Sequence, residues 1–378
     1  MEDSLPASIF DVETPCLLVD IDIVKKNCQT MIDRCKTMGV ELRPHMKTHK
    51  TVEGAELMTN GTKRKIVVST LDEAIFFADN GFEDILWGSP IVPGRISKRL
   101  INLCNKLEEF HVMVATLVGL EAILATPLNE GKKWSVFLEI DCGYGRTGCC
   151  WNSEEIISIC EKIKQSNNMI FQGLYTHCGN SYSPDIETKN SIQQTTFDRL
   201  IDVKSKLSGL GLECKTVGCG STPSCSKPIE CLSNLTEMHP GNYIFYDYMQ
   251  VLANSCDFED IACKVATTVV DHKPEVQTLV VDCGWTAFGL DAPHDQFKDA
   301  PLGQAPIVDH PELRMFSMTQ ELGKLKAAEG EIDYSKYPLG SRLYLYPWHS
   351  CCTTCAHPFY YVHSGEKIVG KWRTTRGW

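Results

Sequence analysis

The segment HMKTHK places Lys47 between two imidazoles, His45 and His49, directly after a short apolar run. A lysine amine that is desolvated and close to other cations loses its proton more readily and can then attack a carbonyl group. Protonated neighbours, including Lys50, would favour the neutral amine of Lys47 by like-charge repulsion. Lys47 is therefore a candidate nucleophile, with Lys50 as the rival and a solvated loop as the interpretation without chemistry.

Two glycine-rich turns could hold a phosphate group. The first is GCGSTPS at residues 218–224, where small residues expose backbone N–H groups beside hydroxyls. The second is HPGNY at residues 239–243. Ordinary loops have a similar composition, so each turn alone decides little. Together with a nucleophilic lysine, the two turns favour pyridoxal phosphate held on Lys47 as a Schiff base.

A third group of reactive residues, PWHSCCTTCAH, lies near the end of the sequence. His349 and Cys351 are two residues apart, so in a strand their side chains would leave the same face and could bind one metal ion. An imidazole and a thiolate favour Zn²⁺. Cys352 would point the other way, and Cys352 with Cys355 could instead form half a structural zinc site or a redox pair. Buried structural cysteines are a further interpretation.

The elements that must position these residues follow a regular order. Segments such as 71–80 and 154–165 have the 3.6-residue periodicity of amphipathic helices, and they separate β-rich runs. This alternation predicts an α/β fold whose core is a (β/α)8 TIM-type barrel. An open doubly wound sheet is the alternative, but no GxGxxG follows an early strand. The eight runs are GVELRP, KIVVS, DILWG, HVMVA, WSVFLEID, MIFQGLYTH, CKTVG and LTEMHPG.

The pattern changes after about residue 255, where runs such as IACKVATTVV, RLYLYPWHSC and KIVGKW show little helical periodicity. We therefore predict two domains, a barrel over residues 12–254 and a mainly β domain over residues 255–378. Sites in such barrels form at the carboxyl ends of the strands. That rule would bring Lys47, Arg146, His177 and both glycine-rich turns to one mouth.

Composition limits the remaining classes. The 378 residues carry a formal net charge of −11, which argues against a surface that binds nucleic acid. No apolar run is long enough to span a membrane. The acidic start lacks the features of a secretory signal, so we expect a cytoplasmic protein whose 19 cysteines are reduced thiols.

The order and spacing of these motifs resemble the alanine racemase-like group of pyridoxal phosphate enzymes, and within it the eukaryotic D-serine dehydratases and their D-threonine aldolase relatives. The resemblance extends nearly from end to end, through TPCLLVDIDIVKKN, RPHMKTHK, DCGYGRTG, GLYTHCGNSY, GCGSTPSC, HPGNYIFYD, DCGWTAFGLD, HSC and RGW. It implies that Lys47 carries the cofactor and that His349 and Cys351 bind zinc. The cofactor contacts that it implies are Arg146 near the phenolic oxygen, His177 beside the ring, and Tyr175, Tyr182, Gly220, Ser221, Thr222, Gly241 and Asn242.

The resemblance also implies a function. It is that of a pyridoxal phosphate- and zinc-dependent dehydratase that converts D-serine to pyruvate and ammonia, with D-threonine and 3-hydroxy-D-aspartate as further candidate substrates. The alternatives are a D-threonine-type aldolase, which releases glycine and an aldehyde, and a non-enzymatic pyridoxal phosphate carrier. The aldolase branch usually has H-x-D where this chain has His349 and Cys351, which favours the dehydratase.

Two further expectations come from the same resemblance. Many relatives have a histidine at the position of Leu322, so activity could differ here. Relatives of this fold commonly pair, which predicts a homodimer.

Overall fold

The computed structural model describes residues 5–291, 297 and 305–378, and these residues fall into two compact units. One contains residues 30–241 and 375–378, and we call it the barrel unit; the other contains residues 5–29 and the described part of 242–374, and we call it the β unit. This division differs from the predicted limits of 12–254 and 255–378. The physical reason is that strand β1 (Cys16–Asp20) pairs with β11 (Cys263–Lys273) and β17 (Phe359–Ser364).

The barrel unit is built on parallel strands in the order β2-β10-β9-β8-β6-β5-β4-β3. The ends of this order are joined because the N–H of Met46 donates to the carbonyl of Val67, whose own N–H donates to the carbonyl of Pro44. Each strand coincides with one of the eight predicted runs, so the predicted barrel is confirmed. The strands are β2 (Glu41–Leu42), β3 (Ile66–Val68), β4 (Ile85–Pro90), β5 (Phe110–Val114), β6 (Trp134–Asp141), β8 (Met169–His177), β9 (Thr216–Gly220) and β10 (Glu237–Met238), with β7 (Cys149–Cys150) paired to β6.

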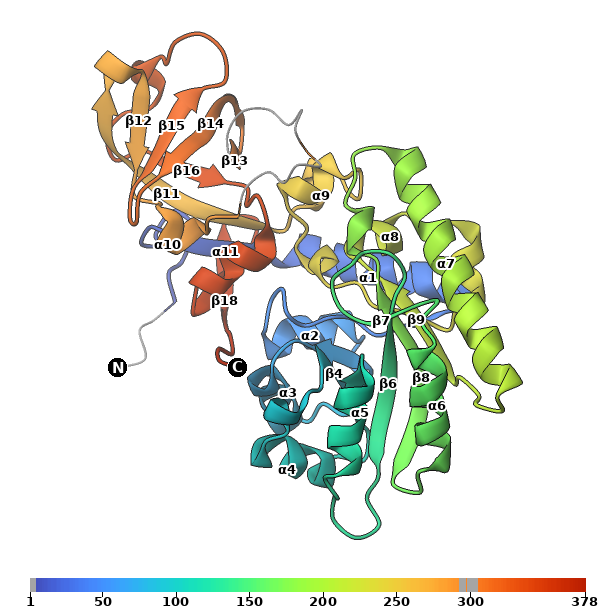
Figure 1. Cartoon of the computed structure of the whole chain (residues 1–378). Helices are drawn as coiled ribbons and strands as arrows, with labels where there is room; N and C mark the ends of the chain where they lie inside the picture. The colour runs from blue at the N-terminus through green and yellow to red at the C-terminus, as the bar shows by residue number, and fades with distance from the viewer. Residues whose placement is uncertain (1–4, 292–296, 298–304) are drawn as a thin grey trace. The chain divides into compact units, whose positions relative to one another are not determined.

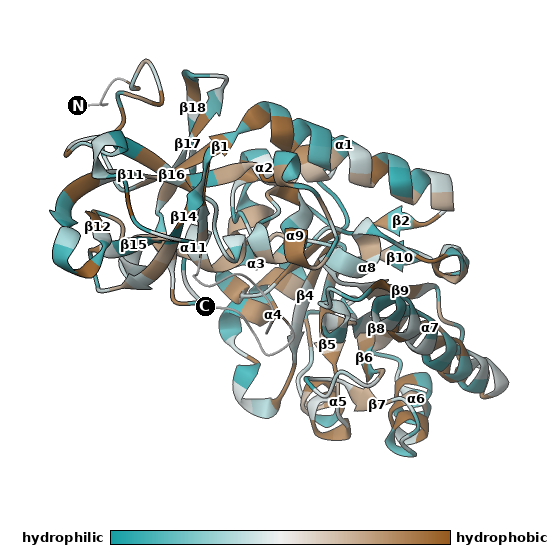
Figure 2. Ribbon diagram, turned by 90° about the horizontal axis from the view of Figure 1, so that it is seen from above, coloured by the Kyte–Doolittle hydropathy of each residue, from teal (hydrophilic) through white to brown (hydrophobic). Residues whose placement is uncertain are grey.

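Amphipathic helices cover the outside of these strands (Figure 1). In α6 the buried positions Ile156, Ile159, Cys160 and Ile163 recur with helical spacing, and Figure 2 shows polar and apolar residues alternating along α6 and α7. Hydroxyl caps fix several starts: Thr70 accepts a hydrogen bond from the N–H of Glu73 at the start of α3. The helices are α2 (Val52–Met58), α3 (Leu71–Asp79), α4 (Lys98–Lys106), α5 (Leu117–Leu124), α6 (Glu155–Gln165), α7 (Ile186–Gly209) and α8 (Thr222–Ser226); α1 (Ile21–Met38) leads from the β unit into β2.

A buried ionic network joins the short strands inside the barrel. Arg43, which is 4% exposed, donates from Nε to Glu237 at 2.9 Å and from Nη1 to Asp84. His239 donates from Nε2 to the same oxygen of Glu237 at 2.7 Å, and His111 contacts Asp84 at 3.0 Å. The strands β2 and β10 have only two residues each, so these side-chain bonds supplement a short backbone ladder.

The β unit has a nine-stranded, almost wholly antiparallel sheet in the order β12-β15-β14-β13-β16-β11-β1-β17-β18. Because β12 also pairs with β11, six of these strands form a closed ring. The predicted mainly β character is confirmed, although the sequence runs did not include β13, β14 or β15. The remaining elements are β12 (Thr278–Val281), β13 (Ala305–Ile307), β14 (His310–Met318), β15 (Gly323–Ala327), β16 (Arg342–Leu345), β18 (Lys367–Arg373), α9 (Tyr248–Leu252), α10 (Trp285–Phe288) and α11 (Ser350–Ala356).

All 19 cysteines are free thiols, and most of them are buried. Within the described ranges, no helix has the length and the apolar character that crossing a bilayer requires.

Replacing Arg43 by methionine should destabilise the protein because it leaves Asp84 and Glu237 as buried carboxylates without their counter-ion. We expect the free energy of unfolding, measured by urea denaturation at pH 7, to fall by about 3–5 kcal/mol. Arg64→Met is the matched control: Arg64 also pairs with two carboxylates, Glu83 and Glu109, but at an exposed position. Its loss should cost roughly 0–1 kcal/mol. Equal stability of the two variants would contradict this account of the network.

The same network predicts a pH dependence. Burial would raise the pKa of both carboxyl groups, but Arg43 and the two histidines lower the pKa of Asp84 and that of Glu237 to about 2. Both pKa values are thus lower in the folded than in the unfolded chain, so the stabilisation is present above pH 4.5 and is lost as the pH falls toward 2. The stability difference between the wild type and Arg43→Met should shrink over that range.

Candidate active site

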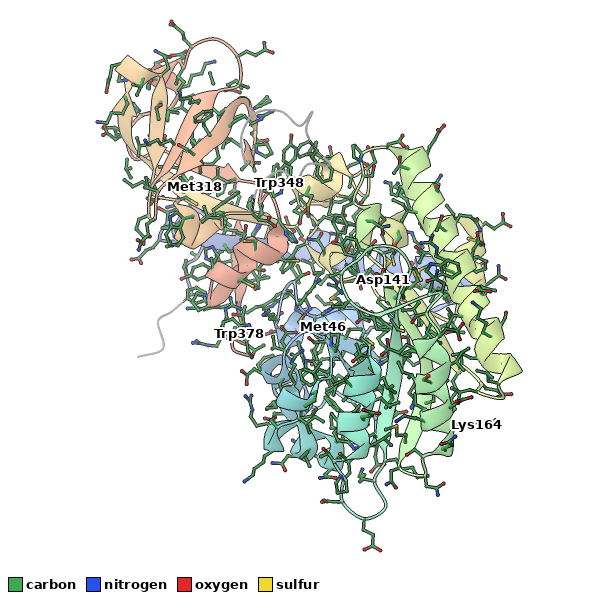
Figure 3. All side chains as sticks on the ribbon, in the orientation of Figure 1. Met46, Asp141, Lys164, Met318, Trp348 and Trp378 are labelled. Atoms are coloured by element: carbon green, nitrogen blue, oxygen red, sulfur yellow. The ribbon has the colours of Figure 1, made fainter. Side chains whose placement is uncertain are left out.

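Lys47 lies in a group of cationic and imidazole side chains at the mouth of the barrel unit. The pKa of His45 is lowered well below its ordinary value, first by burial and then by the charges of Lys47, His177, His239 and Arg146. These effects require the five groups to lie close together. In Figure 3, Met46, next to Lys47, and Asp141, at the end of β6, lie toward the same end of the sheet. The predicted gathering of strand ends at one mouth is therefore present.

The imidazoles of this group are neutral at pH 7. Burial, Lys47 and Arg146 lower the pKa of His177 to about 3, and burial lowers the pKa of His49 to about 3. His49 also accepts the N–H of Thr51 and so belongs to the start of α2. The hypothesis that protonated His45 and His49 would repel the lysine charge is therefore wrong, because burial keeps both rings uncharged.

The ion pair that Lys50 forms makes Lys50 a weaker candidate than Lys47 for the reactive amine. Its Nζ lies 3.0 Å from Oε1 of Glu73, whose side chain is 1% exposed. Withdrawing the Lys50 ammonium would leave that buried carboxylate without its charge partner, which is costly. Lys47 is consequently the better candidate for the reactive amine.

His177 has a defined orientation and tautomer. Its Nδ1 donates to the carbonyl of Gly220 at 2.9 Å, because a carbonyl oxygen can only accept. A neutral ring that carries its proton on Nδ1 presents Nε2 as a hydrogen-bond acceptor. Tyr175, on the same strand, stacks against His239 with ring centroids 4.4 Å apart. The phenol ring of Tyr175 is therefore buried and fixed in orientation.

The turn at residues 218–224, which we call the phosphate turn, is closely packed. A Cβ atom on Gly220 would lie 2.7 Å from the backbone nitrogen of His239, so only glycine fits. Ser221 uses both its N–H and its hydroxyl in bonds with Ser224 that begin α8. Ser221 thus positions the start of α8. Gly220 and Thr222 are the small residues beside it in the turn. Thr222 is buried.

The other predicted contacts divide between the two units. Arg146 lies in the loop after β6, is 45% exposed, and approaches Oε1 of Glu139 to 3.8 Å. Tyr182 ends a short 3-10 turn after β8. Gly241 packs against His45, where a Cβ atom would lie 2.8 Å from the His45 carbonyl. Asn242 belongs to the β unit, as described next.

His349 and Cys351 do not lie in a strand, which corrects the interpretation drawn from their spacing. Strand β16 ends at Leu345, His349 is the N-cap residue of α11, and Cys351 is in its first turn. The side chains still interact. Although burial opposes it, the charge of Cys351 and hydrogen bonds to Asp291 and Cys351 raise the pKa of His349 well above its ordinary value.

Buried polar groups hold this pair in place. Asp247 accepts the N–H of Ser350, between the two residues, at 2.8 Å. The amide of Asn242 donates to Asp247 at 2.6 Å and to the Ser350 hydroxyl at 2.7 Å, and it lies 3.8 Å from the Cys351 sulfur. Asp291 binds Nδ1 of His349, so Nε2 is the nitrogen left for a metal ion. Among the described residues, no group of three or more His, Cys, Asp and Glu side chains could hold a metal.

Comparison with known proteins then identifies the family. Residues 19–249 match the family model of the alanine racemase N-terminal domain, and residues 262–363 match that of a putative serine dehydratase domain. D-serine dehydratase from Dictyostelium discoideum is 34% identical over 392 residues, covering 98% of each chain. The chain belongs to the D-serine dehydratase family. This is a branch of the fold-type III pyridoxal phosphate enzymes.

Other members of the D-serine dehydratase family support the assignment. D-threo-3-hydroxyaspartate dehydratase from Delftia sp. is 30% identical and covers 100% of both chains. The crystal structure of that enzyme superposes with a TM-score of 0.91 at 28% identity, covering 98% of this chain and 100% of the other. Two further structures of it replace a histidine, and a cysteine two positions later, by alanine; the cysteine variant is in the metal-free form.

The barrel mouth fits the family's cofactor. A half-buried lysine after a strand, a phosphate turn in which only glycine fits at position 220, an arginine and the ring of Tyr175 are the groups that a charged aromatic aldehyde needs. Sequence reasoning missed Glu139, Asp247 and Asp291. Glu139 had a signal, since it is a carboxylate inside the otherwise apolar run WSVFLEID, whereas nothing local distinguishes Asp247.

Gly220→Ala should weaken cofactor binding. The added methyl group meets the backbone of His239, and overpacking of this kind costs about 1–3 kcal/mol. We expect affinity for pyridoxal phosphate, measured by absorbance titration of the apoprotein, to fall about tenfold because 1.4 kcal/mol corresponds to that factor. Gly209→Ala is the control, since a Cβ atom there meets nothing within 4 Å. Unchanged affinity in Gly220→Ala would show that the turn does not contact the cofactor.

Proposed function

We propose that the protein is a pyridoxal phosphate-dependent lyase that converts D-serine to pyruvate and ammonia. The observation that carries the proposal is the gathering of Lys47, Arg146 and neutral His177 at one barrel mouth. The 34% identity to the D-serine dehydratase of Dictyostelium discoideum supports the choice of substrate. The bound cofactor supplies an electron sink for the negative charge that develops on the substrate Cα.

Lys47 has two tasks in this proposal. Its Nζ would hold the cofactor at rest, and the same nitrogen, when free, would accept the Cα proton of the substrate. His45 and His177, whose pKa values are lowered first by burial, are neutral and add no charge beside this amine.

The neighbouring residues orient the cofactor. Tyr175, held flat by His239, offers a surface for one face of the ring, and Nε2 of His177 can accept a hydrogen bond. Arg146 would place its positive charge near the phenolic oxygen, and its guanidinium lies 3.8 Å from Oε1 of Glu139. The phosphate turn, Tyr182, Gly241 and Asn242 complete the proposed contacts.

His349 and Cys351 would bind zinc through Nε2 and Sγ. The donor set fits this ion, and Asp291 fixes the imidazole. The Delftia enzyme has a histidine and a cysteine at the same spacing, and its variant with that cysteine replaced by alanine is in the metal-free form. Zinc would supply Lewis acidity toward the β-hydroxyl leaving group. Among the described residues, two proposed ligands belong to this set, so water and substrate would complete the coordination.

The D-threonine-type aldolase and the carrier remain the alternatives, and the products separate them. Preference among D-serine, D-threonine and 3-hydroxy-D-aspartate, and the homodimer, also stay predictions. Leu322 lies at the turn between β14 and β15 and is 43% exposed.

Purified protein should release pyruvate from D-serine and not from L-serine. Lys47→Ala should lower kcat roughly 10²–10⁴-fold, the usual contribution of a proton-transfer group. Lys63→Ala is the control, because that surface lysine pairs with Glu56 and donates to the carbonyl of Asn80, and it has no part in the proposed site. Glycine and an aldehyde from D-threonine would instead indicate the aldolase, and cofactor binding without any turnover would indicate the carrier.

His349→Ala and Cys351→Ala should each lose zinc, measured by atomic emission on dialysed protein, while the cofactor absorbance is retained. Activity should fall in both variants and in wild-type protein treated with a chelator. Cys352→Ala, which changes the adjacent thiol, should keep its zinc. Retention of zinc by both ligand variants, or activity indifferent to the chelator, would remove the proposed metal site.

A further inference from the structure

Two buried cysteines contact each other at the phosphate turn, which contains one of them, Cys219. Cys178 follows β8, Cys219 lies in β9, and their sulfur atoms are 3.5 Å apart. Both side chains are 2% exposed. Neither thiol has a part in the proposed reaction, although each is adjacent in sequence to a residue of the site, His177 or Gly220.

The surroundings of the two thiols differ. The sulfur of Cys178 lies 3.2 Å from the Ser224 hydroxyl and 3.8 Å from the Ser221 hydroxyl, in addition to Cys219. Hydrogen bonds with Cys219, Ser224 and Ser221 lower the pKa of Cys178 against the effect of burial, whereas the bond with Cys178 and burial raise the pKa of Cys219. Cys178 is thus the more readily ionised thiol and Cys219 its proton-bearing partner.

We propose that Cys178 and Cys219 form an oxidisable dithiol that a hydroperoxide converts into a reversible disulfide. The Cys178 thiolate attacks one oxygen of hydrogen peroxide, the O–O bond breaks, and with one proton a water leaves, so that Cys178 becomes a sulfenic acid. The Cys219 thiol then attacks that sulfur. The S–S bond forms, the S–O bond breaks, and the hydroxyl leaves with the Cys219 proton as a second water. The two thiols are oxidised and the peroxide is reduced.

The position of Cys178 and Cys219 distinguishes their expected reactivity from that of the other cysteines among the nineteen. Burial excludes bulky disulfide reagents, so the small hydroperoxide is the matching oxidant. Cys142 and Cys225 are buried nearby, but Cys142 bonds to Thr176, and burial raises the pKa of Cys142 to about 12. Burial raises the pKa of Cys225 as well. Cys142 and Cys225 are therefore harder to ionise than Cys178.

Disulfide formation would also disturb the cofactor site, a consequence that rests on the proposed function. The sulfurs must approach from 3.5 Å to about 2.05 Å. That movement pulls on the chain at His177 and Gly220, which are joined by the 2.9 Å hydrogen bond, and on the Ser221–Ser224 bonds that shape the turn. Oxidation should therefore release pyridoxal phosphate, and reduction should restore its binding.

The test is to treat the holoprotein with hydrogen peroxide, block the remaining thiols under denaturing conditions, and map peptides by mass spectrometry. We expect a peptide pair linked through Cys178 and Cys219, loss of cofactor absorbance in step with the link, and recovery of both after dithiothreitol. Cys178→Ser and Cys219→Ser should each abolish the link and the peroxide-dependent loss of cofactor. Cys142→Ser, the neighbouring buried thiol, should leave both unchanged.

Recovery of Cys178 and Cys219 as free thiols, when the exposed Cys150 and Cys355 are already oxidised, would overturn the proposal. So would conversion of Cys178 to a sulfinic acid without a link to Cys219. The peptide map of wild-type protein decides this without any variant. A link that forms in a protein that binds no cofactor would preserve the dithiol and refute only the proposed active site.

Discussion

The buried guanidinium of Arg43 is the interaction on which the barrel mouth depends. It joins the first strand to the third through Asp84 and to the last through Glu237, and Glu237 in turn fixes His239. The neighbouring strands that it connects through Glu237, β2 and β10, are the two shortest of the ring, with two residues each. A charge network inside the barrel therefore supplies what a short ladder of backbone bonds does not, and Lys47 follows only four residues after Arg43.

Closure and burial together set the electrostatics of the mouth. Burial is the largest cause of the lowered pKa of His45 and of His177, and the charges of Lys47 and Arg146 lower the pKa of each imidazole further. The result is one arginine and one lysine amine among imidazoles that burial keeps uncharged. Under the proposed function, the positive charge of Arg146 would attract the anionic cofactor.

The sequence was sufficient to predict the barrel because its strands are continuous apolar runs separated by periodic helices, and the eighth run matches β10 even though only Glu237 and Met238 form the strand. Strand β1 could not be assigned correctly, since TPCLLVD gives no sign that it pairs with strands some 245 and 340 residues later. The turn-rich strands from β13 to β15 were missed for the same reason. Their pairing is set by closure of the second ring and not by a local pattern.

Some residues of the candidate site could also be selected from the sequence, as could most strands of the barrel. Spacing and motif order selected Lys47, Arg146, Tyr175 and His177, which the structure brings together. The strand expected at His349 was wrong because HSCCTTCA has the composition of a strand, whereas Asp247, more than 100 residues earlier, captures the Ser350 N–H at the start of α11. The protonation of the imidazoles also lay beyond the sequence, since it follows from burial by distant strands.

The identity of the cofactor lysine is the central claim, and it can be measured directly. Holoprotein would be reduced with sodium borohydride, which fixes pyridoxal phosphate permanently to the amine that carries it, and the labelled peptide would be sequenced by mass spectrometry. The account predicts a single phosphopyridoxyl group on Lys47. Label on Lys50, or distributed over surface lysines, would contradict it.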